Sequence, residues 1–262
     1  MSTNKTKTIM KIIVALTFLL MLIVNILSTT LPINGVTPGE VSDSHPNLFA
    51  PAGITFAIWG VIYLLLAMYT LYQIGLFQKD KSTKKLVLME KVGLYFFISS
   101  IANAAWIFAW HYNKIPLSLL LMIVILVCLI LINRIINPNQ LSLREKFFIR
   151  LPFSVYFGWI TVATIANVTT LLVSIGWNGF GISEPIWAII MVFVGMMIGI
   201  ATILKNKDIA YGLVLIWAYV GILIKHISDS GFSSQYPAVI ITVIICIILF
   251  FIAEIYTLYS QK

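Results

Sequence analysis

Aromatic and amide side chains recur at helical spacing in three apolar segments of this chain. The three sets are Phe56, Trp59 and Tyr63; Asn103, Trp106 and Trp110; and Trp159, Ala163 and Asn167. Because a helix turns about 100° per residue, the members of each set share one face of their helix. Indole and phenol rings bind flat apolar molecules by ring contact, and amides add directed hydrogen bonds. The three faces therefore predict one shared ligand pocket, with plain helix packing as the alternative for each.

The depth of three tryptophans favours the pocket over packing. Tryptophans of membrane proteins usually lie at the two interfaces, where the ring meets both water and lipid. At a rise of about 1.5 Å per residue, Trp59, Trp106 and Trp159 instead fall near the midplane or in the outer half of their segments. A buried indole N–H needs an acceptor, and Asn103 and Asn167 are the available amides. Three further tryptophans fit the interfacial role: Trp110, Trp177 and Trp187.

Groups for familiar enzyme chemistry do not form a recognisable set in this sequence. It has no Ser-His-Asp set, no glycine-rich phosphate loop, no cysteine cluster and no carboxylate pair within a span, so hydrolysis and phosphoryl transfer are not expected. Glu40, Asp43 and His45 lie close together, but mixed ligands without a repeated spacing fit a solvated loop better than a metal site. We therefore expect no metal and no obligatory cofactor.

Two other ionisable residues have plain structural interpretations. His111 follows Trp110 at the end of an apolar segment, where an interfacial hydrogen bond is expected rather than haem ligation. Glu254 lies near the end of the last apolar segment. We expect its side chain to extend to the lipid headgroups together with Tyr256 and Tyr259, rather than to relay protons.

The composition identifies the elements that must position these residues. Of 262 residues, 60% are hydrophobic and only 10% are charged, and the mean hydropathy is +1.01, which is too apolar for a soluble globule. A bilayer core of about 30 Å needs roughly 20 apolar residues per helix. We therefore predict an all-α, polytopic membrane helix bundle with about eight transmembrane helices. They fall near residues 10–29, 52–77, 92–112, 116–136, 148–175, 186–204, 209–224 and 238–256.

The cations orient this bundle. Lys and Arg near span ends favour the cytoplasmic side of a membrane. With the N terminus placed inside, 15 of the 17 Lys and Arg residues fall inside, and only Lys114 and Lys225 fall outside. We therefore predict that the N and C termini are both cytoplasmic and that the chain is a multi-pass protein of the cell membrane. The net charge of +8 then reflects topology, and no nucleic-acid partner is expected.

The outer side of this topology is poor in positive charge. Its titratable groups are Lys114, Lys225, His111 and His226 against Glu40, Asp43, Glu184 and Asp229. An anionic ligand that approaches from outside would gain little electrostatic steering. An apolar or neutral ligand that arrives through the bilayer fits the predicted pocket equally well.

Two glycines one helical turn apart in the sixth span form a small-residue step, which could be a contact with another helix. Gly195 and Gly199 are four residues apart, which lets another helix backbone approach closely. Packing within the chain is the preferred interpretation, because eight helices have many internal contacts to make. A homodimer seam is the alternative.

The three aromatic sets, taken with their neighbours, resemble a known family. Pro51, Trp59 and Tyr63 in one helix, Asn103 and Trp106 in the next, and a fifth helix with Trp-x-x-x-Ala-x-x-x-Asn are similar to the tryptophan-rich sensory protein family, also called TspO/MBR or translocator protein. In this chain the fifth-helix matches are Tyr156, Trp159, Ala163 and Asn167. Order and spacing agree across three helices.

The resemblance implies a fold, a ligand class and a set of lining residues. The family has a five-helix membrane fold whose members bind porphyrins, haem-like tetrapyrroles or sterols between helices. It implies a bundle over residues 1–175 and a three-helix C-terminal extension over 176–262. The implied ligand-binding residues are Trp59, Tyr63, Asn103, Trp106, Trp159, Ala163 and Asn167. The resemblance implies a non-enzymatic binding or sensory role, with porphyrin photo-oxidation as a minor alternative.

Two rival functions stay open at this point. A small-molecule membrane transporter is suggested by the eight spans, although the internal repeats and interrupted helices typical of transporters are not evident. An assembly or scaffold protein that uses Gly195 and Gly199 as its contact is the other rival.

Overall fold

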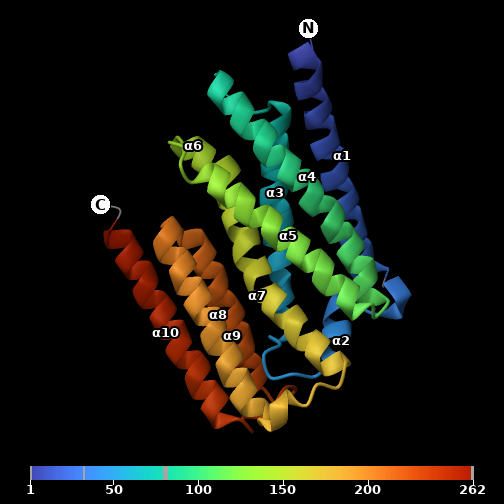
Figure 1. The fold of residues 1–262 in the computed structure, drawn as a ribbon, viewed down its shortest axis with the longest axis vertical. Coiled ribbons are helices and arrows are strands. Elements are labelled where there is room, and N and C mark those ends of the chain that lie inside the picture. The colour runs from blue at the N-terminus through green and yellow to red at the C-terminus, as the bar shows by residue number, and fades with distance from the viewer. Residues whose placement is uncertain (1, 32, 79–81, 261–262) are drawn as a thin grey trace. The chain divides into compact units, whose positions relative to one another are not determined.

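The computed structural model describes residues 2–31, 33–78 and 82–260, with side chains described from Thr8 onward except that of Thr83 (Figure 1). Within these ranges the chain is helical and contains no β-strand. Eight helices are long and apolar enough to cross a membrane: Thr8–Thr30, Gly53–Ile74, Lys84–His111, Ile115–Ile136, Leu143–Ser174, Glu184–Asn206, Ile209–Ile227 and Pro237–Tyr259. The predicted all-α bundle with eight spans is confirmed, and the chain is a multi-pass membrane protein.

The helical elements follow one another with short connections. They are α1 (Ser2–Thr30), η1 (Ile33–Gly35), α2 (Pro38–Asp43), η2 (Gly53–Ala57), α3 (Ile58–Ile74), α4 (Thr83–His111), α5 (Ile115–Ile136), α6 (Leu143–Glu145), η3 (Lys146–Arg150), α7 (Leu151–Ser174), η4 (Gly179–Gly181), α8 (Glu184–Asn206), α9 (Ile209–Ile227) and α10 (Pro237–Tyr259). Helix α4 begins about two turns before the predicted start at residue 92, because the apolar count marks the membrane-embedded part of a helix and not its polar end.

The start of the fifth span shows how local sequence sets a helix boundary. Ser142 caps the N terminus in a capping box: its hydroxyl accepts the Glu145 N–H, and the Glu145 carboxylate accepts the Ser142 N–H. Lys85 adds an ion pair of 2.8 Å to Glu145. A π-helical turn over Lys146–Arg150 then leads into Pro152, whose ring lacks the N–H that a regular helix would use.

The chain divides into two compact units. Unit one comprises Met1–Pro38 and Trp59–Phe157, and unit two comprises Gly39–Ile58 and Gly158–Lys262. Helix α7 begins in unit one and ends in unit two. The division at residue 175 follows from the family resemblance, whereas these two units follow from contacts within the chain. The contacts do not test the division at residue 175, which stays a prediction.

Unit one is organised around helix α4. This helix packs against both α1 and α5 (Figure 1). At its centre the fully buried ring of Phe96 contacts Phe18, Tyr69 and Phe153, with ring centroids 6.2, 5.3 and 5.5 Å apart. The Tyr69 and Phe153 rings are 4.6 Å apart and meet edge to face. This aromatic cluster joins α1, α3, α4 and the start of α7, and such edge-on pairs add stability beyond the area they bury.

Unit two packs α10 against both α8 and α9 (Figure 1). The small-residue step of α8 is used inside this unit. A Cβ on Gly195 would lie 2.6 Å from the Tyr219 hydroxyl, and one on Gly199 would lie 2.5 Å from Leu215 and 2.7 Å from Phe250. Both glycines therefore serve packing within the chain, as the preferred interpretation predicted. These contacts give no support to a homodimer seam at this step.

The loop that follows α2 belongs to unit two and is fixed along α9. The Ala52 N–H donates to Gly221 O at 3.0 Å, and the Trp217 indole N–H donates to Thr55 O at 3.0 Å. His226 Nε2 lies 2.9 Å from Leu48 O. These bonds hold residues 44–52, which connect α2 to η2 and have no helix of their own.

Gly158 provides a test of the packing in unit two. An added Cβ would lie 2.8 Å from Tyr211 O and 2.9 Å from Val214 Cβ, and backbone atoms cannot move aside cheaply. We expect Gly158→Ala to destabilise the protein by about 1–3 kcal/mol, measured as a lower melting temperature in detergent. Gly60→Ala is the matched control, since nothing lies within 4 Å of its Cβ. Equal melting temperatures for the two variants would contradict this account.

The orientation of the termini is a second expectation that can be measured. Five of the cations behind it are outside the description: Lys79, Lys81 and Lys262, and the side chains of Lys5 and Lys7. In a Cys128→Ser and Cys246→Ser background, we expect Ser230→Cys to react with a membrane-impermeant maleimide on intact cells. Gln140→Cys should react only after permeabilisation. Both residues are exposed in loops between spans, and the opposite labelling pattern would reverse the topology.

Candidate functional site

Three aromatic side chains of unit one form a partly exposed wall. Trp59 stacks on Tyr63 with ring centroids 5.4 Å apart and planes 15° apart. Its ring also meets Tyr156 edge to face at 5.9 Å. Tyr156 is fully buried, whereas Trp59 and Tyr63 are partly exposed. The i, i+4 spacing of Trp59 and Tyr63 on α3 therefore produces the shared face that the sequence predicted.

A chain of buried hydrogen bonds lies beside this wall. The Asn25 amide donates to Asn103 Oδ1 at 2.8 Å and to Met21 O at 2.8 Å. The Asn103 amide in turn donates to the Tyr156 hydroxyl at 3.1 Å. Asn103 and Tyr156 have no exposed surface, and Asn25 is 7% exposed. The chain ties α1, α4 and α7 together within unit one.

This network corrects one prediction and adds two residues. Asn103 was expected to accept from a buried indole, but its carbonyl oxygen accepts from Asn25, and its amide donates to Tyr156. Asn25 was not predicted as a site residue, and Tyr156 was cited only for the family pattern. The available signal was the position of Asn25 inside an otherwise apolar span, where an amide is costly unless another helix satisfies it.

One tyrosine and one tryptophan of unit one each carry a buried donor that has no acceptor among the described residues. They are the Trp106 indole N–H and the Tyr63 hydroxyl. Trp106 is held in place by stacking on Trp110 at 5.4 Å, and the Trp110 indole N–H donates to Pro38 O at 3.0 Å. A buried donor without an acceptor costs about 1–3 kcal/mol. These two groups can therefore bind an acceptor atom supplied by a ligand.

The remaining predicted site residues belong to unit two. Trp159 is 3% exposed and meets Phe56 edge to face at 5.8 Å. Asn167 is 2% exposed, and Ala163 between them is half-buried. Thr161, two residues after Trp159, accepts a hydrogen bond from the Tyr211 hydroxyl at 3.2 Å. That all seven predicted residues line one pocket stays a prediction.

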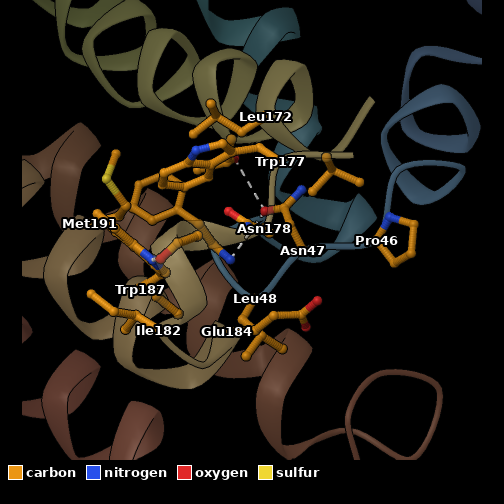
Figure 2. Close-up of a pocket in the computed structure, with 15 residues that line it drawn as sticks. Pro46, Asn47, Leu48, Leu172, Trp177, Asn178, Ile182, Glu184, Trp187 and Met191 are labelled. Carbon is orange, nitrogen blue, oxygen red and sulfur yellow. Dashed lines mark hydrogen bonds between the residues drawn. The ribbon is translucent and has the colours of Figure 1, made fainter. Parts of the chain in front are cut away.

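Unit two also contains a cavity that the sequence did not predict (Figure 2). Its volume is about 260 Å³. Four segments surround it: the loop between α2 and η2 (residues 44–52, the first loop), the end of α7, the η4 turn and the first turns of α8. Its lining consists of Pro46, Asn47, Leu48, Phe49, Thr169, Leu172, Val173, Trp177, Asn178, Gly179, Ile182, Glu184, Trp187, Ala188 and Met191.

Local backbone chemistry builds this cavity. Asn47 Oδ1 accepts from the Ala50 N–H at 2.9 Å and from the Thr169 hydroxyl at 3.3 Å, which fixes the first loop against α7. On the opposite side Gly179 has φ of 63°, a conformation that suits glycine. The Trp187 indole N–H donates to Gly179 O at 2.7 Å, and an added Cβ on Gly179 would collide with this ring.

Two tryptophans that were expected only to lie at the membrane–water interface also line this cavity. Trp177 and Trp187 pack on each other with ring centroids 5.0 Å apart. Both line the cavity, as Figure 2 shows. The sequence offered a signal in the Trp-Asn-Gly-Phe-Gly turn just before α8, but nothing in the spacing showed that the first loop would close the other side.

Glu254 differs from its expected position. The side chain was expected to reach the headgroups, but it is 5% exposed and lies against Gly212 of α9. Tyr256 and Tyr259 are exposed, as an outward face requires. The absence of a side chain at Gly212 makes room for the carboxylate, a property of the α9–α10 contact that α10 alone does not reveal.

The loop cluster and His111 have structural partners. Asp43 forms an ion pair of 2.7 Å with Lys225, and His45 Nδ1 lies 3.2 Å from Val41 O. His111 is 2% exposed, and its Nδ1 lies 2.7 Å from Ile107 O. Among the described residues, no group of three or more His, Cys, Asp or Glu side chains is placed to hold a metal ion.

Comparison with known proteins gives one clear finding. A family model described as "TSPO-like protein" matches residues 11–256, a range that includes most of α1 and most of α10 and everything between them. The resemblance found in the sequence is thereby confirmed. No curated protein and no solved structure matches the chain.

The hydrogen-bond chain of unit one yields a double-mutant test. Asn103→Ala leaves the Tyr156 hydroxyl and the Asn25 amide with fewer partners, so we expect a loss of about 1–3 kcal/mol in stability. With Tyr156→Phe, the cycle should show a coupling of about 0.5–1.5 kcal/mol between the two side chains. Thermal unfolding in detergent measures all four proteins, and strictly additive effects would refute the bond.

Proposed function

The chain belongs to the TSPO-like protein family, and on this premise we propose that it binds a tetrapyrrole or another apolar ligand among its membrane helices. Porphyrins and haem-like molecules are the tetrapyrroles concerned. We further propose that the protein is a non-enzymatic sensor of this ligand in the cell membrane. No metal and no obligatory cofactor take part in this function.

The proposal is supported by two buried donors of unit one that have no acceptor in the described part of the chain, one of which belongs to the aromatic wall. The Tyr63 hydroxyl and the Trp106 indole N–H are buried without acceptors among the described residues. Tyr63 is also half of the stacked pair with Trp59. A flat ligand with acceptor atoms at its edge would stack on the rings and relieve both donors. The carboxylates or ring nitrogens of a tetrapyrrole are such acceptors.

The proposed lining gives each residue a distinct role. Within unit one, Trp59 supplies ring surface, and Tyr63 and Trp106 supply donors. Within unit two, Trp159 supplies ring surface. Ala163 leaves space for a flat ligand because its side chain is small. Asn103 holds its helix through Asn25 and Tyr156. Asn167 completes the proposed set.

Titration with protoporphyrin IX tests this function. We expect saturable quenching of tryptophan fluorescence in the purified protein. Trp59→Phe combined with Trp106→Phe should weaken the apparent affinity roughly tenfold, because one ring contact of about 0.5–1.5 kcal/mol is reduced and one hydrogen-bond donor worth about 0.5–1.5 kcal/mol is lost. The readout is the titration midpoint, since the number of fluorophores changes.

A matched double variant controls for loss of tryptophan itself. Trp177→Phe with Trp187→Phe removes the same number of indoles from the cavity of unit two and should leave the midpoint unchanged. Absence of quenching in the unmodified protein, or equal midpoints for both double variants, would count against the proposal. Net flux of the porphyrin into proteoliposomes would favour the rival transporter function, whereas saturable binding without flux would favour a sensor.

A further inference from the structure

The cavity of unit two has a chemistry different from that of the proposed tetrapyrrole site. We propose that it is a separate binding site for a small amphipathic organic cation, namely an ammonium group that carries one apolar or aromatic substituent. The inference does not depend on the proposed function, because the cavity shares no residue with the proposed tetrapyrrole lining.

The size and walls of the cavity set the apolar part of the ligand. Pockets for drug-sized ligands span about 300–1,000 Å³, so a cavity of about 260 Å³ suits a smaller molecule. Apolar side chains from three segments cover most of its surface: Leu48, Phe49, Leu172, Val173, Ala188 and Met191. A single ring or a short branched alkyl group matches this lining.

Most polar side chains of the lining already have partners within the protein. Asn47 Oδ1 accepts from the Phe49 and Ala50 N–H groups and from the Thr169 hydroxyl. The Asn47 amide donates to His45 O at 3.0 Å. The Trp187 indole N–H donates to Gly179 O. These groups stabilise the shape of the cavity and do not offer themselves to an anionic ligand.

Glu184 is the exception. It is the sole ionisable side chain among the described residues that line the cavity, and it is exposed. In the described part of the chain its carboxylate forms no hydrogen bond or ion pair. An acidic residue in the first turn of α8 also interacts favourably with the helix dipole. The helix dipole does not account for the pair of indole rings that lines the same cavity. A carboxylate without a cation attracts a positive ligand and repels an anionic one.

The indole pair supplies the second element of cation recognition. Trp177 and Trp187 both line the cavity, with ring centroids 5.0 Å apart and planes inclined by 57° (Figure 2). A cation within about 6 Å of an indole face is attracted by the ring quadrupole, more strongly when water is partly excluded. Quaternary ammonium groups are the ligands that such aromatic cages commonly hold.

The experiment compares two probes of the same shape. Benzyltrimethylammonium carries the charge, and neopentylbenzene replaces its nitrogen with carbon. In calorimetric titrations of the detergent-solubilised full chain, we expect the cation to bind at least threefold more tightly than the neutral probe. Equal affinities would overturn the proposal.

Variants then assign the preference to the cavity. Glu184→Gln should weaken binding of the cation about three- to tenfold and leave the neutral probe unchanged. Trp187→Leu should weaken both probes. Asp229→Asn is the matched control, because it removes an exposed carboxylate that does not line the cavity. An equal loss in Asp229→Asn and Glu184→Gln would show a general surface-charge effect and refute the site.

Two further arms identify the source of the ligand and separate the two proposals. Competition by phosphatidylcholine vesicles, but not by phosphatidylglycerol vesicles, would identify the cation as a lipid headgroup. Equal probe affinity in both vesicle types would identify a free amine. Glu184→Gln should leave the midpoint of the protoporphyrin titration unchanged, so failure of either proposal can be recognised independently.

Discussion

The structure depends on one constraint: inside the hydrocarbon core no water satisfies a polar group, so the protein must do it. The chain from Asn25 through Asn103 to Tyr156 is the clearest consequence. Each of these side chains would be costly on a helix facing lipid. Together they join three helices of unit one at fixed positions. The Trp59 and Tyr63 rings lie beside this fixed framework through the contact of Trp59 with Tyr156, which holds the geometry of the proposed ligand wall.

Because buried polar groups must be satisfied within the protein, the groups that lack a partner are informative. Most buried polar groups of a folded protein have partners, so the Trp106 indole N–H and the Tyr63 hydroxyl stand out. The Trp106 ring is held in place, because it stacks on Trp110, which is itself bonded to Pro38 O. A rigid donor cannot rotate toward an alternative acceptor. Sites that bind ligands commonly retain such unsatisfied groups at a cost to stability.

In unit two, close contact at glycines holds the helices together. In lipid, helices gain little from burying apolar surface against one another, so tight packing carries the association. Gly158, Gly195 and Gly199 each lie where a Cβ would meet a neighbouring helix at 2.5–2.8 Å. The cavity at the end of α7 and α8 lies outside these contacts and is framed by loops instead. Its shape comes from hydrogen bonds of Asn47 and Trp187 and not from helix packing.

By itself the sequence determined the number of spans, the helical class, the family and the face that Trp59 and Tyr63 share. These follow from composition and from the 3.6-residue period, which are properties of one segment at a time. The tertiary structure decided what each face meets. Asn103 found Asn25 and Tyr156 as partners, Glu254 turned inward to Gly212, and a loop over 100 residues away in sequence closed the cavity beside Trp187. Periodicity fixes a direction on a helix, but only the packed chain fixes the neighbour in that direction.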